Sequence, residues 1–255
     1  MVENADKGIY IFCGMQTEAE KDFGSVMVEG TERKIFTIHF KDAAMVAAEV
    51  PMKIYKPNKE NLLMHQEVIA SVMGRCDTVI PISFGNVFKT RADVAALLEN
   101  LYPQFSELFP KIKGKMEVGL KVIGKKEWLE QEVQRDPQIS AMADTVQSKS
   151  EAAGYYDRIK LGGAAQKMVE GLQNEIKEDV YMPLTEKAEA AKANDPIGER
   201  MLLNASFLVD KENETAFDDA VNKAYEKWQD KVGFQYTGPW PAYNFINIRL
   251  TVEET

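Results

Sequence analysis

The residues that come closest to a nucleotide-binding motif lie near the middle of the chain. Gly119 and Gly124, followed by Lys125 and Lys126, fit the pattern G-x-x-x-x-G-K of a phosphate-binding loop. Lys126, however, stands where that loop needs a hydroxyl for Mg²⁺, and the residues between the glycines alternate as they do in a strand. A phosphate loop needs irregular backbone whose amides point at the phosphate. The sequence therefore favours a strand followed by a basic helix start, and a nucleotide-dependent enzyme is the alternative.

Side chains that bind metals or act as general bases are few. The chain contains two histidines, His39 and His65, and two cysteines, Cys13 and Cys76. Neither histidine has a Cys, His or carboxylate at a zinc-binding offset, and neither shows the partner that a general base needs. The cysteines have neither a disulfide-framework nor a metal spacing, so we expect them to be reduced and structural. We expect no catalytic residue, no cofactor and no metal site.

The common sequence signals of enzymes are also missing. The chain has neither the G-x-S-x-G elbow of hydrolases nor the G-x-G-x-x-G turn of dinucleotide-binding proteins. Its acidic runs are typical of the solvated faces of amphipathic helices. Catalytic residues can converge from distant segments, but these absences favour a protein that is not an enzyme.

The composition limits the kinds of protein that this chain can be. The chain has 255 residues, 45% of them hydrophobic and 28% charged, and a net charge of −9. This composition predicts a globular protein of one large or two small domains, of which we favour two. The negative charge disfavours nucleic acid as a partner. Because the N-terminus does not resemble a secretory signal and no apolar stretch reaches 18 residues, we expect a cytoplasmic protein that does not span a membrane.

The first half of the chain predicts a mixed α+β domain over residues 1–110. Strands are expected where β-branched and aromatic residues gather, and helices where apolar residues recur at spacings of three or four. Pro103 and Pro110 are expected to make the end of the second helix irregular. The expected elements are strands 8–14 and 34–40 joined by a hairpin turn of three to five residues, a helix capped by Asn61, two short edge segments within 78–88, and a helix from Thr90.

The second half predicts another domain over residues 111–255. The expected elements are a strand over 116–122, a long helix over 161–180, a strand over 200–210, a helix over 217–228, and a terminal strand over 245–250. Gly162 and Gly163 interrupt the long helix, which indicates a close packing contact or a break there. Strand, long helix, strand, helix and terminal strand together predict a ferredoxin-like α+β sandwich with an enlarged first crossover.

One segment stands out from the rest of the composition. Residues 236–245 (YTGPWPAYNF) place two prolines around Trp240, with two tyrosines and a phenylalanine nearby. Such a stretch cannot form a regular helix. It suits either a binding surface rich in rigid aromatic area or a tail that braces the fold, and bracing is favoured. As a core aromatic, Trp240→Ala would then lower stability by about 3–5 kcal/mol.

At this segment the sequence resembles the gas vesicle protein F/L family, whose members carry Gly-Pro-Trp-Pro-Pro-Tyr-Asn-Phe near the C-terminus. The resemblance extends, in family order, to residues 81–88 (preceded by His65 on a helix), 117–122, 154–156 and 202–209. It is nearest to the F-type proteins of bacilli, although Ala242 and Val118 depart from the commoner residues. The signature residues, for which a structural role is expected, are Pro81, Phe84, Gly85, Glu117, Gly154, Asn204, Pro239, Trp240, Pro241, Tyr243, Asn244 and Phe245.

The resemblance implies a fold and a function. It implies an N-terminal α+β domain followed by a modified ferredoxin-like domain with a long helical insertion and an extended tail. It also implies an accessory or minor shell-associated protein that binds gas vesicle structural protein A and other gas vesicle accessory proteins, in the cytoplasm and associated with gas vesicles. The N-terminal domain is the favoured contact surface, and a purely structural wall component is the alternative.

Overall fold

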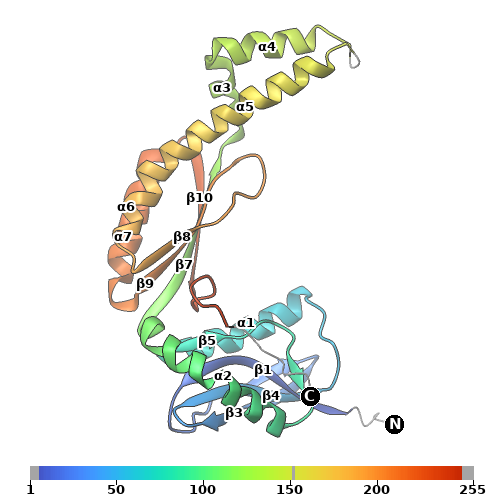
Figure 1. Cartoon of the computed structure of the whole chain (residues 1–255), viewed down its shortest axis with the longest axis vertical. Helices are drawn as coiled ribbons and strands as arrows, with labels where there is room; N and C mark the ends of the chain where they lie inside the picture. The colour runs from blue at the N-terminus through green and yellow to red at the C-terminus, as the bar shows by residue number, and fades with distance from the viewer. Residues whose placement is uncertain (1–5, 151–152, 249–255) are drawn as a thin grey trace. The chain divides into compact units, whose positions relative to one another are not determined.

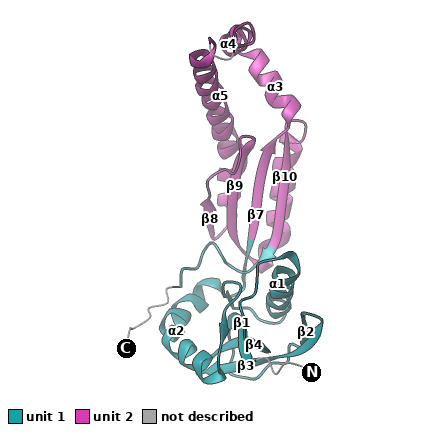
Figure 2. Cartoon of the chain, turned by 90° about the vertical axis from the view of Figure 1, so that its right-hand side faces the viewer, with its two compact units in different colours: residues 1–117, 239–255 teal, residues 118–238 magenta. Residues whose placement is uncertain are grey.

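The protein is described here by a computed structural model that covers residues 6–150 and 153–248. It is a mixed α+β fold with antiparallel strand pairs. The chain divides into two compact units (Figure 2), one formed by residues 1–117 with 239–255 and the other by residues 118–238. Among the described residues, no helix is both long and apolar enough to cross a membrane.

Unit 1 is built on one sheet and two helices (Figure 1). The strands lie in the order β2-β3-β4-β1-β5, and β6 pairs with β1 beyond this path. The pairs β1–β4, β1–β5, β1–β6, β2–β3 and β3–β4 are all antiparallel. The elements of this unit are β1 (Lys7–Gln16), β2 (Ser25–Val28), β3 (Thr31–Phe40), β4 (Ala43–Pro51), α1 (Lys59–Met73), β5 (Val79–Pro81), β6 (Val87–Phe88) and α2 (Arg91–Ile112).

A bulge in β1 decides which side chains face which helix. The register of β1 against β4 shifts between Ile11 and Cys13. Alternation before the shift places Tyr10 and Phe12 on the α1 side, and after it the odd-numbered Cys13 joins them in the same core cluster. Gly14 consequently faces α2, where a Cβ added to it would overlap the ring of Phe105.

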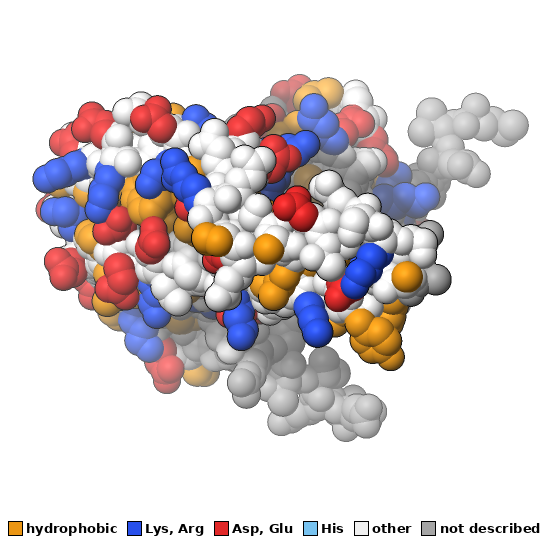
Figure 3. Space-filling model, turned by 90° about the horizontal axis from the view of Figure 1, so that it is seen from above, with side chains coloured by type: hydrophobic (Ala, Val, Ile, Leu, Met, Phe, Trp, Pro, Cys, Tyr) orange, Lys and Arg blue, Asp and Glu red, His pale blue; other side chains and the backbone are white. Residues whose placement is uncertain are grey.

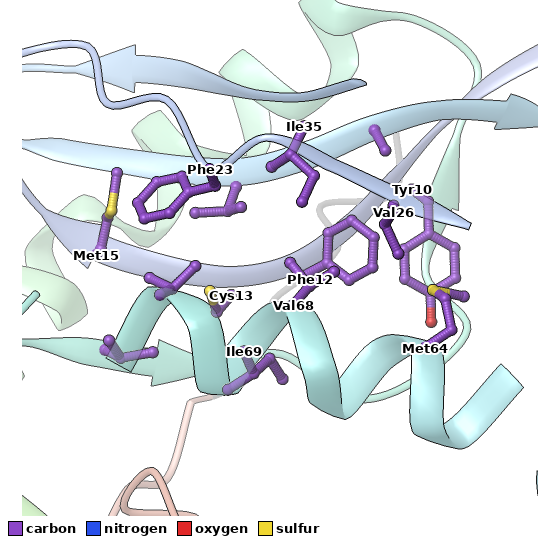
Figure 4. Close-up of a cluster of buried hydrophobic side chains, with 14 of the residues drawn as sticks. Tyr10, Phe12, Cys13, Met15, Phe23, Val26, Ile35, Met64, Val68 and Ile69 are labelled. Atoms are coloured by element: carbon purple, nitrogen blue, oxygen red, sulfur yellow. The ribbon is translucent and has the colours of Figure 1, made fainter. Parts of the chain in front are cut away.

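The core between β1 and α1 is a cluster of buried, mainly hydrophobic side chains (Figure 4). Phe12, Val68 and Ile69 lie between the strand and the helix. The ring centroids of Tyr10 and Phe12 are 4.8 Å apart. Both cysteines, Cys13 and Cys76, are buried and form no disulfide, as expected from their spacing.

The structure corrects several sequence-based expectations for unit 1. The hairpin between β2 and β3 turns on two residues, Glu29 and Gly30, both at positive φ, instead of three to five. α1 is capped by Asn58, whose side chain accepts from the amide of Asn61, the residue expected as the cap. The strands and the two short segments within 78–88 are confirmed.

α2 continues through both of its prolines. Thr90 and Asp93 form a capping box at its start. A proline inside a helix removes a backbone hydrogen bond and costs about 3 kcal/mol. The helix, however, buries a stripe of six apolar side chains, and full burial of each contributes about 1.5–3 kcal/mol, more in total than the roughly 6 kcal/mol that two prolines cost. These side chains are Val94, Leu98, Leu101, Phe105, Phe109 and Ile112. Packing on the sheet therefore outweighs the irregularity expected at Pro103 and Pro110.

Unit 2 carries a four-stranded sheet in the order β10-β7-β9-β8. Its core includes Phe207 and Phe217, with ring centroids 5.3 Å apart. The strands β7 and β9 and the helix α7 confirm the expected elements. The elements are β7 (Lys115–Gly124), α3 (Lys126–Arg135), α4 (Pro137–Gln147), α5 (Tyr155–Ile176), the π-helical η1 (Lys177–Tyr181), α6 (Met182–Thr185), β8 (Ala190–Ala193), β9 (Met201–Asp210), the 3₁₀ turn η2 (Lys211–Asn213), α7 (Glu214–Trp228) and β10 (Val232–Trp240).

The second half of the chain also differs from expectation. α5 runs unbroken through Gly162 and Gly163, and a Cβ added at either would meet no other atom of the described chain within 4 Å. The glycines therefore mark neither a helix break nor a close contact within the described chain. The terminal strand is absent over the part of 245–250 that the structure describes, since Phe245 to Ile248 form a turn and irregular backbone; Leu250 lies outside the described residues.

The compact units differ from the expected ranges 1–110 and 111–255. Residue 110 lies inside α2, so the first unit extends to Glu117. Residues from Pro239 onward belong to the first unit, because Asn244 hydrogen-bonds to Glu117 and the tail lies against α1. Whether each unit is a separately folding domain stays a prediction.

Candidate functional site

Two of the segments that carry the family resemblance lie against the same helix of unit 1. The segment around Phe84 and Gly85 contacts α1 through His65. The tail from Pro239 to Tyr243 contacts α1 through Ile69 and Met73. We call the first contact the Tyr10–His65 network and the second the tail contact.

The Tyr10–His65 network joins β1, α1 and the segment after β5 by hydrogen bonds. Nε2 of His65 lies 3.1 Å from the carbonyl oxygen of Ile82, and Nδ1 lies 3.0 Å from the hydroxyl of Tyr10. Because a carbonyl can only accept, Nε2 carries the proton and Nδ1 accepts from Tyr10. The same hydroxyl accepts from the amide of Gly85 at 3.0 Å. The network is satisfied with His65 neutral.

Burial shifts both titrating groups of this network. Desolvation raises the pKa of Tyr10 to about 12, partly offset by the amide of Gly85. Desolvation also lowers the pKa of His65, although its bond to Ile82 opposes the shift. Both shifts favour the neutral forms. The nitrogen of His65 that could accept a proton, Nδ1, already accepts from Tyr10, so the network has a structural character.

The lowered pKa of His65 predicts a pH dependence of stability. The unfolded histidine titrates near 6.5, and the folded one titrates lower. The unfolded state therefore binds more protons below that pH, and the free energy of unfolding falls as the pH is lowered through and below 6.5. Urea denaturation between pH 7.5 and 5.5 is expected to show a smaller loss for His65→Gln than for the wild type. His39→Gln is the control for the loss of a histidine elsewhere in unit 1; a slope for His65→Gln equal to that of the wild type would contradict the assignment.

Gly85 and Phe84 are fixed by this arrangement. Gly85 has a φ of 90°, which side chains rarely tolerate. Phe84 packs edge-on against His65, with ring centroids 5.7 Å apart. Pro81, the first residue of the signature here, ends the short strand β5 opposite Cys13.

The tail contact is a mainly apolar junction with a small void. Its remaining void is about 20 Å³, roughly the space of one water molecule. Trp240 is only half-buried, so the larger loss expected for a core tryptophan is too high, and about 2 kcal/mol is the better expectation for Trp240→Ala. The void is lined by Gln66, Ile69, Ala70, Met73, Pro239, Trp240, Pro241 and Tyr243.

A buried carboxylate holds the tail by two hydrogen bonds. Glu117, only 4% exposed, accepts from the backbone amide of Asn244 at 2.7 Å and from its side-chain amide at 2.5 Å. Bonds to an ionised group are stronger than neutral ones. Tyr243 lies nearby, and burial together with Cys13 and Glu117 raises its pKa to about 12. The amide of Phe245 closes the turn on Ala242.

The other signature residues lie in unit 2, apart from these contacts. Gly154 precedes α5, and its amide bonds to the carbonyl oxygen of Ser150 at 2.9 Å. Asn204 on β9 donates to the carbonyl oxygen of Asp195 at 3.0 Å and so ties down the loop after β8. Both residues order local backbone and do not join the α1 contacts.

The phosphate-loop alternative finds no support in the backbone. Residues 119–124 lie in β7. The amide of Gly124 bonds to the carbonyl oxygen of Arg200 and that of Lys125 to the carbonyl oxygen of Lys231. The Lys125 ammonium donates to the carbonyl oxygen of Gln229 at 2.7 Å. Amides engaged in this way cannot cradle a phosphate. Within the described chain, no cluster of three His, Cys, Asp or Glu is placed to hold a metal ion.

The sequence does not single out Tyr10, although its hydroxyl hydrogen-bonds to both His65 and Gly85. Its only signal was its place in an apolar strand, where a tyrosine reads as one more core residue. Its partner His65 showed no partner in the sequence, because the hydrogen bond between them spans 55 positions. Periodicity describes faces of elements and carries no information about such distant pairs.

The comparisons with known proteins agree with these segments. Residues 8–247 match the family described as gas vesicle synthesis protein GvpL/GvpF. Gas vesicle protein F1 of Halobacterium salinarum is 26% identical over 89% of this chain and 87% of its own length. The crystal structure of the gas vesicle protein GvpF from Anabaena sp. PCC7120 has a TM-score of 0.80 at 22% identity, covering 96% of this chain and 100% of that one. That of GvpF from Microcystis aeruginosa has a TM-score of 0.74 at 19% identity, covering 93% and 98%. The chain belongs to the GvpL/GvpF family of gas vesicle synthesis proteins.

Proposed function

We propose that this protein supports formation of the gas vesicle wall by binding gas vesicle structural protein A through unit 1. Membership of the GvpL/GvpF family over residues 8–247 carries the gas vesicle role. A subunit that builds a gas-facing wall exposes apolar surface and aggregates unless another protein covers it. A partner for such a subunit needs exposed apolar side chains of its own.

Unit 1 carries such side chains near the start of α1. Ile54, in the loop before the helix, is 92% exposed, and Leu63 in the first turns of α1 is 44% exposed. The loop is held to the β2–β3 hairpin by the ion pair of Lys53 with Glu29. The further exposed apolar side chains among residues 25–63 are Met27, Met52 and Leu62.

Aspartate substitutions at these positions test the contact surface. Ile54→Asp with Leu63→Asp is expected to weaken co-purification with structural protein A at least tenfold, which corresponds to about 1.4 kcal/mol. Ile197→Asp is the matched control, because Ile197 is also highly exposed, at 70%, but lies in unit 2. Full binding by the double variant would remove unit 1 as the contact. The absence of any complex with the wild type, together with normal vesicles after deletion of the gene, would overturn the proposed function.

A purely structural wall component is the second candidate. It is separated from an assembly factor by the amount of the protein that purified vesicles retain: a fixed stoichiometric share supports the wall component, and loss on washing supports the assembly factor. We further propose that the protein is cytoplasmic, associates with gas vesicles and other gas vesicle accessory proteins, binds no nucleic acid and is of the F type.

We also infer that unit 2 is a modified ferredoxin-like domain. Two features support this: its strands and main helices follow the order β-α-β-β-α-β, and the sheet places the first strand beside the last. The helices α3 and α4 with the N-terminal half of α5 would then be the long insertion in the first crossover, and the C-terminal half of α5, which buries Leu172 and Ile176, would be the crossover helix.

A further inference from the structure

The N-terminal half of α5 exposes an apolar face that unit 2 does not use. Tyr155, Tyr156 and Ile159 are 61%, 76% and 56% exposed. The two tyrosine rings contact each other edge-on, with centroids 5.5 Å apart. Figure 3, which looks onto this end of the unit, shows hydrophobic side chains at the surface with lysine and arginine side chains beside them. Large exposed aromatics next to one another are typical of interaction surfaces.

Two glycines continue this face, and no contact within the described chain requires a glycine at either position. Gly162 and Gly163 lie inside α5, yet a Cβ at either would meet open space as far as the chain is described. Glycine weakens a helix relative to alanine. A backbone that passes close to α5 would give these positions a reason to lack a side chain.

Helix geometry places these residues on one stripe with basic borders. At about 100° per residue, Ile159 and both glycines follow the tyrosines along one side of the helix. Lys160 and Lys167 fall along one border of the stripe, and Arg158 falls along the other. We call this stripe with its borders the α5 face.

A hollow beside the face offers room for an anchoring side chain. It has a volume of about 410 Å³ between α4 and α5, and Lys160 belongs both to it and to the border of the α5 face. Met142 and Ala141 supply apolar contacts there, while Asp157 is paired with Lys149 at 2.6 Å.

The charges decide between two occupants. In an antiparallel two-fold pair of this helix, the Lys160 border would meet its own copy, and in a parallel pair it would meet Arg158. Both arrangements oppose like charges, which disfavours a second copy of the chain. We propose that the α5 face binds an amphipathic helix of another protein whose apolar stripe is bordered by acidic residues. This site lies in unit 2 and is independent of the proposed contact through unit 1.

Photo-crosslinking in cells that form gas vesicles tests the site with the full chain. Ile159 is replaced by p-benzoylphenylalanine, and Tyr225, which is exposed on α7 of the same unit, carries the same photo-residue as the control. Mass spectrometry then maps the crosslinked segment. We expect a segment of another protein with apolar residues at helical spacing and acidic residues at their borders. A crosslink to a second copy, to a segment without that pattern, or none above the Tyr225 control would overturn the proposal.

A synthetic peptide of the crosslinked segment gives the quantitative test by fluorescence anisotropy with the purified chain. Lys160→Glu with Lys167→Glu is expected to weaken binding at least tenfold, and lysines in place of the acidic border of the peptide should restore it. Gly163→Gln should raise the melting temperature yet weaken binding at least fivefold. Gly171→Gln is matched to it, since Gly171 is equally open but lies about two turns further along α5, beyond the exposed apolar residues, and should raise the melting temperature alone. Equal binding by all these variants would contradict the site.

Discussion

Phe105→Ala is expected to lower the free energy of unfolding by about 3–5 kcal/mol, the usual loss for a buried phenylalanine. Phe105 is fully buried on α2 and lies directly over Gly14 of β1. Gly14→Ala in the wild type should lower stability too, by about 1–3 kcal/mol, because its methyl group would overlap the Phe105 ring. The ring fits only because position 14 has no side chain.

The effect of Gly14→Ala on the free energy of unfolding is expected to change sign when Phe105 is also replaced by alanine. In the Phe105→Ala background, alanine at position 14 fills part of the cavity, so it should raise stability. Urea denaturation of the wild type, both single variants and the double variant measures this coupling. Additive losses would show that Gly14 and Phe105 are not in contact.

Glu117→Gln is expected to lower the free energy of unfolding by about 2–4 kcal/mol, although it changes one atom. Glu117 accepts two hydrogen bonds from Asn244. Glutamine can accept only one of them and places its own donor against the other, and hydrogen bonds to charged groups contribute about 1.5–3 kcal/mol. Denaturation should show the loss, and proteolysis near residue 240 should become faster.

Two further variants test whether Glu117 stabilises the fold through its hydrogen bonds to Asn244. Glu107→Gln, at an exposed position of α2, should change stability by less than about 0.5 kcal/mol. In an Asn244→Ala background the effect of Glu117→Gln should shrink, because the shared bonds are already gone. Undiminished loss in that background would show that Glu117 acts through other groups.

The sequence predicts elements best where one face is apolar and the other polar. The alternation of β7 and the β-branched runs of β1 and β3 are visible in this way. β4 was missed, because its alanines are poor strand formers and both of its faces are buried, which removes the alternation. The end of α2 was expected to be irregular at Pro103 and Pro110, because local propensity carries no information on the packing of Phe105 and Phe109 against the sheet.

The candidate site could be located by resemblance but not explained by it. The signature named Gly85, Glu117 and Asn244, yet only the structure shows that Asn244 bonds to Glu117 and that Gly85 bonds to Tyr10. These partners are separated by 127 and 75 positions. Physical pairing over such distances depends on the path of the whole chain, which local patterns do not encode.

Unit 1 is completed only at the end of translation, because it combines residues from both ends of the chain. Its sheet and both helices are complete by Glu117, but the segment that covers Ile69 and Met73 begins at Pro239. While the ribosome translates the intervening 118–238, this side of α1 has no cover from its own chain. A nascent chain thus exposes an apolar patch while residues 118–238 are translated, and that patch is where a chaperone would bind before Asn244 emerges and reaches Glu117.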